Sequence, residues 1–465
     1  MQHEQAPGAT PTLARALGLF SGTMLVAGFM IGTGVFKKIV PMAQSGLTGG
    51  EILLAWVLAG VVTFMGSSIV ADVSGVTEES GGTYEYLRIA FGRFTAFLFG
   101  WTDFLIIGCA SLAAIAFVLA QTINTLVPLP NPLEAWSQIH LGIIYPFADS
   151  GIKILAIAFL WAFVWVNCTG VRKAGMLNNL FSVAKIAGIV LLIIGGLFFI
   201  SDPSTGSISG KAVVDTHGAS TFSLILGAML SALWAYDGWV DISFVTGEIK
   251  NPKRNVPLAI IIGVSVVMIL YVLVNYAYLR SLSVQELASI GPNQVGAAVV
   301  AEKIFGPTGK ILMAALLITS VSGALNAIML AHARIFFRMA QEKSFFRKAA
   351  IVHPKTRTPN HALVYTGIWS SVLIISGTFD MLTDMVIFAG FLFYALLIAA
   401  LFKFRKQGKL HKKPFLFPFV QIIMLVFSIA LIINTFYIMP TQSLIGAGLV
   451  SSSVIFYYVF KGKDA

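Results

Sequence analysis

Long apolar runs separated by short polar loops are the main pattern of this chain. Twelve such runs can be delimited, at residues 17–39, 48–73, 93–123, 150–167, 174–200, 221–246, 257–280, 310–338, 360–378, 382–403, 415–438 and 441–460. Most are close to the roughly 20 residues that a helix needs to cross a bilayer. In hydrocarbon only helices and closed barrels satisfy the backbone, and the two-residue alternation of barrel strands is absent. The pattern predicts an all-α membrane protein with twelve transmembrane helices.

Composition agrees with this prediction and excludes several other classes. Hydrophobic residues make up 57% of the chain, charged residues 11%, and the mean hydropathy is +0.85. A soluble domain carries charge on about a quarter of its residues. The net charge of +11 would suit a nucleic-acid partner, but the basic residues lie in short loops between apolar runs. Cys109 and Cys168 fall inside or beside apolar runs, so no disulfide framework is expected.

The basic residues also predict an orientation. Most of the 31 Lys and Arg residues fall in loops on the same side as the N-terminus, and such loops are cytoplasmic in membrane proteins. We therefore expect a multi-pass protein of the cell (plasma or inner) membrane with both termini cytoplasmic. The stretches 79–94 and 283–305 are expected to form either surface helices or ordered loops. The whole chain, residues 1–465, is predicted to be one membrane domain.

The first run contains an anomaly. Its segment GFMIGTGVF places Gly28, Gly32 and Gly34 where a helix in mid-membrane normally holds bulky apolar residues. Glycine costs about 1 kcal/mol relative to alanine in a helix interior. Taken alone, the cluster fits close helix packing as well as it fits an interrupted helix.

A second anomaly lies in the sixth run, where Asp237 and Gly238 follow each other in mid-span. Ionisable residues inside a membrane are expensive and usually functional. Two glycine-broken helices at matching places in two halves are typical of inverted-repeat transporters. The halves would be residues 17–200 and 221–403, with residues 415–460 supplying two further helices.

The chemistry of a broken helix suggests a ligand class. Unwinding frees N–H groups at the start of one half-helix and C=O groups at the end of the other. The N–H end favours a carboxylate and the C=O end an ammonium group. Two such breaks side by side can bind both ends of a zwitterion, and an α-amino acid is the simplest one.

These segments resemble the amino acid–polyamine–organocation superfamily, in particular its L-type amino acid transporter branch and the bacterial homologues of that branch. The resemblance rests on GFMIGTGVF (28–36), WAYDGWVDISFVTGEIKNPKRNVPLAI (234–260), SVSGALNAIMLAHARIFFRMAQEK (320–343) and HPKTRTPN (353–360), with Thr33 where the family has serine. It covers nearly the whole chain. It implies the five-plus-five inverted-repeat (LeuT-like) fold, with helices 1 and 6 unwound at mid-membrane.

The resemblance also implies a substrate site. The substrate-binding residues would be Ile31, Gly32, Thr33, Gly34, Trp234, Ala235, Tyr236, Asp237 and Gly238. The substrate carboxylate would bind the backbone around Gly32–Gly34 and the α-amino group the carbonyls near Trp234–Asp237. Trp234 matches an aromatic position that closes over the substrate, although packing into the bundle would also explain it. Tyr271 matches a tyrosine that reaches the first-span loop, with a gating role.

Lys185, inside the fifth run, has two interpretations. It could extend toward the cytoplasmic interface. The resemblance implies instead that its ammonium replaces a sodium ion between the first and eighth helices, next to first-span carbonyls and a hydroxyl such as Ser320 or Ser322. Sodium-independent transport is the expected consequence.

Four further polar residues receive roles from the sequence. Asp237 is interpreted as a cap of its half-helix, while pairing with a cation or uptake of a proton stays open. Asp241 would line the inner path or pair within the bundle. Asp103 is expected to make a hydrogen bond inside the bundle. His332 is interpreted as a packing residue rather than a proton relay.

Two departures from the family narrow the function. Val240 stands where transporters of large neutral amino acids have asparagine, which argues against large aromatic substrates. Residues 124–149 lack the cysteine that links animal members to a glycoprotein subunit, so no disulfide-linked heavy subunit is expected and the chain looks prokaryotic.

The sequence thus predicts a sodium-independent secondary transporter of neutral L-amino acids, an exchanger that works by alternating access. A proton-coupled symporter and a cationic amino acid or polyamine permease are the alternatives. An enzyme is not expected, because the seven histidines are scattered and no HExxH motif occurs. No cofactor, metal or nucleic acid is expected. A channel would need a polar stripe or charged ring along a pore.

Overall fold

The computed structural model describes most of the chain. It covers residues 17–77, 81–169, 171–200, 208–214, 218–356, 358–410 and 413–461, with the side chains of 171–184, 245, 247–248 and 461 left out. Within this part the protein is helical, and β-structure is limited to three isolated bridges. The predicted all-α class is therefore confirmed for the described residues. The predicted side of the two termini concerns residues outside this part.

Nine membrane-length apolar helices occur in the described part. They are α4–η1 (Gly49–Val76), α6–η2–α7 (Arg93–Leu126), α8 (Ser150–Cys168), α10 with η5 (Thr221–Phe244 of Thr221–Glu248), α11 (Pro252–Ser281), α13 (Gly296–Gln341), α15 (Phe379–Lys406), α16 (Phe419–Ile438) and α17 (Pro440–Phe460 of Pro440–Lys461). Each coincides with one of the apolar runs in the sequence. Helix formation follows from the need to satisfy backbone polar groups within an apolar segment.

The other three apolar runs also hold helices, which are not among these nine. The first contains α1 (Leu19–Met30), α2 (Gly34–Lys37) and α3 (Ile39–Ala43). The fifth contains α9 (Val171–Phe198), of which Lys185–Phe198 forms a shorter apolar helix, and the ninth contains α14 (Asn360–Ser376). The first run is divided because its helix stops and restarts at the glycine cluster.

The two stretches left open between surface helix and loop are helical in their described residues. The first holds α5 (Gly82–Phe91) and the second holds α12 (Val284–Ala288) together with the start of α13, which bends at Gly306 (φ +70°). Ser283 caps α12: its hydroxyl accepts from Glu286 N–H, and the Glu286 carboxylate accepts from Ser283 N–H at 2.8 Å. That N–H bond lowers the pKa of Glu286.

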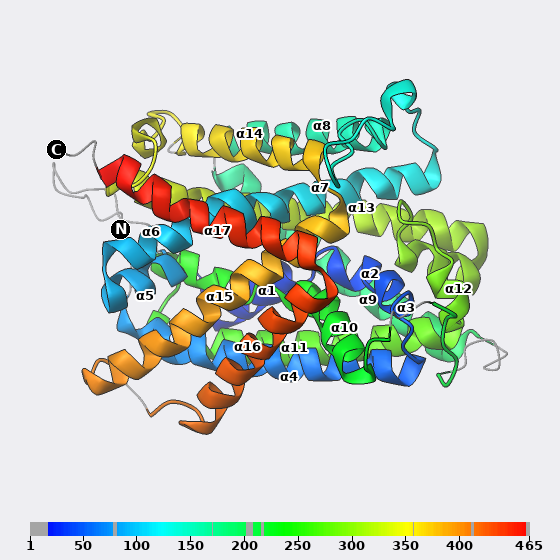
Figure 1. Cartoon of the computed structure of the whole chain (residues 1–465), viewed down its shortest axis with the longest axis horizontal. Coiled ribbons are helices and arrows are strands. Elements are labelled where there is room, and N and C mark those ends of the chain that lie inside the picture. Colours follow the sequence, from blue (N-terminus) through cyan, green and yellow to red (C-terminus); the bar gives the residue numbers. More distant parts are fainter. Residues whose placement is uncertain are drawn as a thin grey trace, which may run out of the picture.

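The long helices form one bundle, most of them running along the longest axis of the molecule (Figure 1). Helix α11 packs against α4, α1 and α9, and α13 packs against α7 and α9. Helices α8 and α14 lie side by side at one edge (Figure 1). Short 3-10 helices complete the loops at η3 (Glu134–Trp136) and η6 (Arg347–Ala350).

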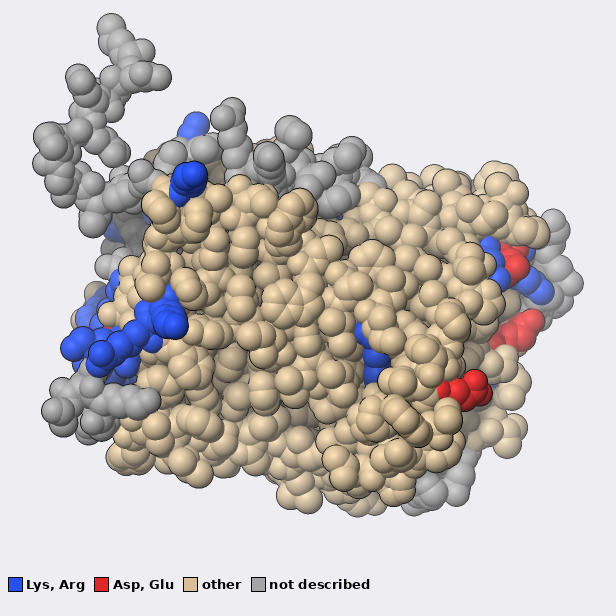
Figure 2. Space-filling model, turned by 90° about the horizontal axis from the view of Figure 1, so that it is seen from above, with Lys and Arg blue, Asp and Glu red and all other residues tan. Residues whose placement is uncertain are grey.

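The surface of the bundle separates charge from apolar area. On the face shown in Figure 2, most of the visible Lys and Arg gather at one end, the visible Asp and Glu lie toward the other end together with a few Lys or Arg, and the surface between the two ends is largely uncharged. Side chains such as Val266 and Ile269 on α11 are 45% and 58% exposed. Large apolar side chains exposed between two charged ends are what a bilayer requires.

Candidate binding site between two interrupted helices

The first interruption separates α1 from α2. Helix α1 ends at Met30, Ile31 takes the non-helical angles φ −75° and ψ 82°, and α2 begins at Gly34. The first N–H groups of a helix have no acceptor within that helix. The buried Thr33 hydroxyl makes no hydrogen bond to any described residue. The break therefore offers N–H and hydroxyl donors inside the protein.

The second interruption ends α10 at Tyr236. Asp237 turns to extended backbone (φ −65°, ψ 162°), Gly238 has φ +103°, and the chain resumes as η5 at Asp241. A positive φ of this size suits glycine and strains other residues. The last carbonyls of α10 thus have no helix beyond them to donate N–H groups.

The two interruptions lie side by side, as predicted. A Cβ built on Gly238 would lie 2.8 Å from the carbonyl oxygen of Phe29, and one built on Gly34 would lie 2.6 Å from the Cβ of Ala235. Both distances are shorter than a real Cβ atom can approach another atom to which it is not bonded. Glycine at these two positions is therefore what allows the backbones to touch.

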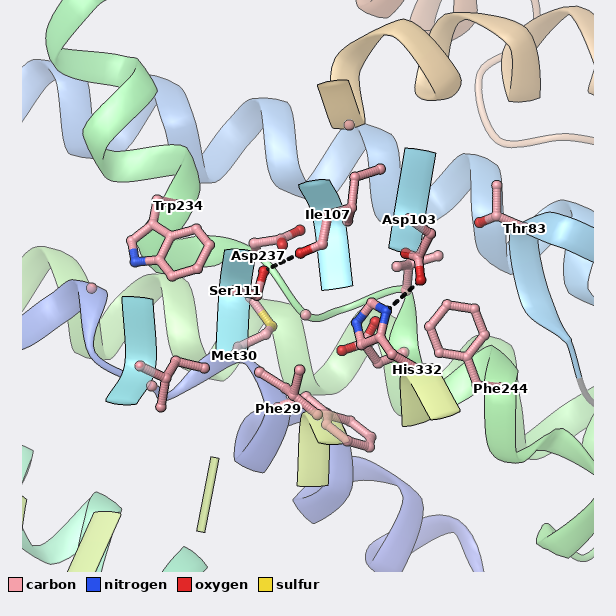
Figure 3. A pocket seen from close by; sticks show the side chains of 18 of the residues that line it. Phe29, Met30, Thr83, Asp103, Ile107, Ser111, Trp234, Asp237, Phe244 and His332 are labelled. Atoms are coloured by element: carbon pink, nitrogen blue, oxygen red, sulfur yellow. Dashed lines mark hydrogen bonds and ion pairs between the residues drawn. The ribbon is translucent and has the colours of Figure 1, made fainter. Parts of the chain in front are cut away.

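A pocket opens where the interruptions meet. It is lined by Phe29, Met30, Gly32, Thr33, Gly34, Thr83, Phe99, Asp103, Ile107, Ser111, Ile115, Trp234, Asp237, Gly238, Val240, Asp241, Phe244, Ile328, His332, Gly390, Phe393 and Tyr394. Figure 3 shows Trp234 toward one end, and Thr83 and Phe244 toward the other. Six of the nine residues predicted to bind substrate line this pocket.

The other three do not line it. Ile31 and Ala235 are buried outside the lining, and the Tyr236 hydroxyl donates to the carbonyl of Trp56 at 3.3 Å. The sequence prediction did not resolve which way each residue beside a break points. On a helix, neighbouring residues face different sides, so residues adjacent to the pocket in sequence can lie behind it.

Tyr271 reaches the first interruption, as the resemblance implied. Its hydroxyl on α11 donates to the carbonyl of Met30 at 2.8 Å. Its ring packs edge-on against Trp56 with 5.8 Å between centroids. The last carbonyl of α1 thus accepts two hydrogen bonds, one from this neighbouring helix and one from the Gly32 N–H at 2.8 Å.

Trp234 lines the pocket from the last turn of α10. Its ring meets Phe379 of α15 edge-to-face at a centroid distance of 6.4 Å. The buried indole N–H finds no acceptor among the described residues. A tryptophan packed on one side with its N–H unsatisfied fits both a lid and a packing residue.

Lys185 lies beside α1. It is 1% exposed, and its Nζ donates to the carbonyl of Gly28 at 2.7 Å. The expected first-span carbonyl contact is therefore present, and the interpretation that the side chain extends to the interface is wrong. The expected hydroxyl contact is not formed, because the buried Ser320 hydroxyl makes no hydrogen bond within the described part. Ser322 is half-buried.

Two pairs of polar side chains bring distant helices together in the pocket. His332 Nδ1 on α13 lies 2.8 Å from Asp103 Oδ2, which confirms the hydrogen bond expected for Asp103 (Figure 3). The Tyr394 hydroxyl on α15 donates to Asp237 Oδ1 at 3.2 Å. Tyr394 was missed in the sequence, where it is one aromatic residue in a run of apolar ones.

Comparison with known proteins identifies the family. The family described as amino acid permease matches residues 17–460. The chain is 28% identical to the b(0,+)-type amino acid transporter 1 of Mus musculus over 453 residues, covering 97% of this chain and 89% of that protein. It is 30% identical to the serine/threonine exchanger SteT of Bacillus subtilis (strain 168) over 418 residues, covering 88% and 89%.

A third relative is the large neutral amino acids transporter small subunit 2 of Oryctolagus cuniculus, 28% identical over 457 residues that cover 97% of this chain and 81% of that protein. All three are similar to this chain over most of its length. Together with the membrane-length helices, the match over nearly the whole sequence shows that the chain belongs to the amino acid permease family of membrane transporters.

Proposed function

We propose that this protein is a sodium-independent secondary transporter of neutral L-amino acids, and that it exchanges them by alternating access. The observation that carries the proposal is the contact between the two interrupted helices, at Gly34 with Ala235 and at Gly238 with Phe29, beside one pocket. Relatives named as amino acid transporters and as a serine/threonine exchanger support the same class.

The substrate would be held by its main-chain groups. Its carboxylate would bind the backbone around Gly32, Thr33 and Gly34, where the start of α2 adds partial positive charge. The Gly32 N–H donates to the Met30 carbonyl here, so the N–H groups of Thr33 and Gly34 are the donors toward the carboxylate. Its α-ammonium would donate to carbonyls at the end of α10, between Trp234 and Asp237. Trp234 would then close over the bound molecule, and Tyr271 would hold the first break in place.

Lys185 supports the absence of sodium coupling. Its ammonium is buried against a carbonyl of α1, one turn before the first break. A cation already resident beside these carbonyls does electrostatically what a bound metal ion would do. We propose that Ser320 and Ser322 on α13 complete this site in another state of the cycle.

The remaining features of the proposal concern the membrane. We propose an arrangement of twelve spans in the cell membrane, with both termini cytoplasmic. It has two repeats at residues 17–200 and 221–403 and two extra helices at residues 415–460. The nine membrane-length helices and the charged end of Figure 2 support it. No disulfide-linked subunit is included, because residues 124–149 lack cysteine.

Proton-coupled symport is the second candidate function, because Asp103, Asp237 and Asp241 all line the pocket. Counterflow in proteoliposomes separates the two. We expect labelled leucine or serine to accumulate in vesicles preloaded with unlabelled substrate, equally with and without sodium and with and without a pH gradient. Uptake into empty vesicles driven by an inward proton gradient would show symport, and a sodium requirement would contradict the proposed role of Lys185.

A further inference from the structure

A second polar group lies in the pocket, away from the two interrupted backbones. It consists of Asp103, Asp241 and His332, which come from three separate helices. Figure 3 shows Asp103 and His332 near Phe244 and on the side of the pocket away from Trp234. The proposed clamp on the carboxylate and the α-ammonium uses none of these three side chains.

Asp103 is only half satisfied. It is 0% exposed, and Oδ2 is held by His332 Nδ1 at 2.8 Å. Its other oxygen, Oδ1, is buried and makes no hydrogen bond within the described part of the chain. Leaving a buried acceptor unpaired is unfavourable, and more so when the acceptor is charged. A donor supplied by a ligand would remove that cost.

The backbone around Asp103 is shaped for this arrangement. Residues Asp103–Ile107 form one π-helical turn inside an otherwise α-helical span. Such turns are rare and occur frequently at functional sites. The next residue is Gly108, where a Cβ would lie 2.6 Å from His332 Nδ1 and 3.1 Å from Asp103 Oδ2. Any larger residue there would separate the imidazole from the carboxylate.

Asp241 adds a second carboxyl group. It is 5% exposed, lines the pocket, and has no hydrogen bond or ion pair from its side chain to a described residue. The imidazole of His332, which is bonded to Asp103, lines the same pocket as Asp241. Two carboxylates and one imidazole leave an excess of acceptors over donors, even with a doubly protonated ring.

We infer that Asp103, Asp241 and His332 form a side-chain subsite, which binds a hydrogen-bond-donating group at the end of the substrate's side chain. This inference rests on the proposed amino acid clamp and adds a specificity element to it. Apolar residues such as Ile107 and Val240 also line the pocket, so they suit the methylene part of a side chain. The donor at the end of the substrate's side chain is either an uncharged amide or hydroxyl group or an ammonium group, and the experiment below distinguishes the two.

Pairs of amino acids with equal numbers of side-chain heavy atoms test the subsite. Norleucine and ornithine differ by a terminal methyl against an ammonium group, and leucine and asparagine differ by an isopropyl against a carboxamide group. Binding of each would be measured by competition with a labelled substrate, using purified protein in nanodiscs. The variants are Asp103→Asn, Asp241→Asn and His332→Gln. Asp72→Asn is the matched control, because its carboxylate accepts from the Phe415 N–H and does not line the pocket.

We expect the wild type to bind at least one donor-bearing member more tightly than its apolar counterpart. Asp103→Asn should weaken binding of that member about tenfold while norleucine and leucine change less than about twofold, and Asp72→Asn should change neither. Preference for ornithine identifies an ammonium ligand, and preference for asparagine an uncharged one. Melting temperatures of all variants would be recorded, because a variant that has lost its fold loses the binding of all four ligands. His332→Gln should keep its fold and retain part of the preference.

Two results would overturn the inference while leaving the proposed function intact. One is equal binding of both members of each pair by the wild type. The other is an equal loss of all four ligands in Asp103→Asn, which would make the Asp103–His332 pair a packing element. If the wild type binds none of the four, the proposed amino acid clamp fails, and the inference fails with it.

Discussion

The ammonium group of Lys38 lies 2.7 Å from Oδ1 of Asp380 and 3.6 Å from Oδ1 of Asp384. Its hydrogen bond to Thr383 completes the set at 2.8 Å. This fully buried lysine directly follows α2, the half-helix after the first break, and joins the end of α2 to the start of α15. Since α2 also carries the proposed carboxylate-binding N–H groups, the lysine holds one wall of the pocket against another helix.

Replacement of this lysine should destabilise the protein. Lys38→Met leaves Asp384 buried without its cation, and breaking a buried pair in this way costs about 3–5 kcal/mol. The double variant Lys38→Met/Asp384→Asn should recover part of the loss. Lys310→Met is the control, because its pair with Glu302 is partly exposed and should contribute less than about 1 kcal/mol. Thermal unfolding in nanodiscs measures all three, and equal effects of Lys38→Met and Lys310→Met would refute the prediction.

The close contact of the two breaks should tolerate no side chain. Gly34→Ala places a Cβ 2.6 Å from that of Ala235, so we expect the half-helices to separate and amino acid binding to fall at least about tenfold, the equivalent of 1.4 kcal/mol. Gly448→Ala in α17 is the matched control, because its Cβ would meet no atom within 4 Å. Equilibrium binding to protein that elutes as a single species gives the comparison. Wild-type affinity in Gly34→Ala would remove the proposed clamp.

Removal of the Tyr271 hydroxyl should lower affinity and stability more than removal of the Tyr278 hydroxyl on the same helix. Tyr271→Phe deprives the Met30 carbonyl of one of its two donors, the other being the Gly32 N–H at 2.8 Å, and the loss of one hydrogen bond costs about 0.5–1.5 kcal/mol. Tyr278→Phe on the same helix is the control, because the buried Tyr278 hydroxyl makes no hydrogen bond to the described residues. We expect lower substrate affinity and a lower melting temperature in Tyr271→Phe and little change in Tyr278→Phe. The reverse order would show that the Met30 carbonyl does not need its second donor.

Lys185 and Lys153 both donate to backbone carbonyls, so comparing them separates a role of Lys185 in exchange from a role in stability alone. Lys185→Met frees the Gly28 carbonyl beside the first break, so we expect exchange to fall at least about tenfold. Lys153 donates to the carbonyls of Tyr145 and Ile375 and does not line the pocket, so Lys153→Met should lower stability and leave substrate affinity unchanged. Counterflow and thermal unfolding on both variants test this. Full exchange by Lys185→Met would exclude a part for its ammonium in the cycle.

The sequence by itself determined the helices and the places where two of them stop. Apolar runs of bilayer length leave the backbone no alternative to the helix. The glycines at positions 34 and 238 mark the breaks because they remove the side chains that would keep the backbones apart. These features are local, so they can be recognised along the chain. The buried lysine in the fifth run was recognisable for the same reason, since its cost in hydrocarbon requires a partner.

Only the tertiary structure decided which polar groups meet. Asp103 and His332 are 229 residues apart, and Lys38 and Asp380 are 342 apart. Their pairing depends on how each helix is rotated about its own axis when it packs, which the wide apolar surface of a membrane helix leaves undefined. The same rotation turns the Tyr236 hydroxyl toward Trp56 and the Tyr394 hydroxyl toward Asp237. The pocket's polar lining is therefore a property of the packed bundle, and its backbone breaks are a property of the sequence.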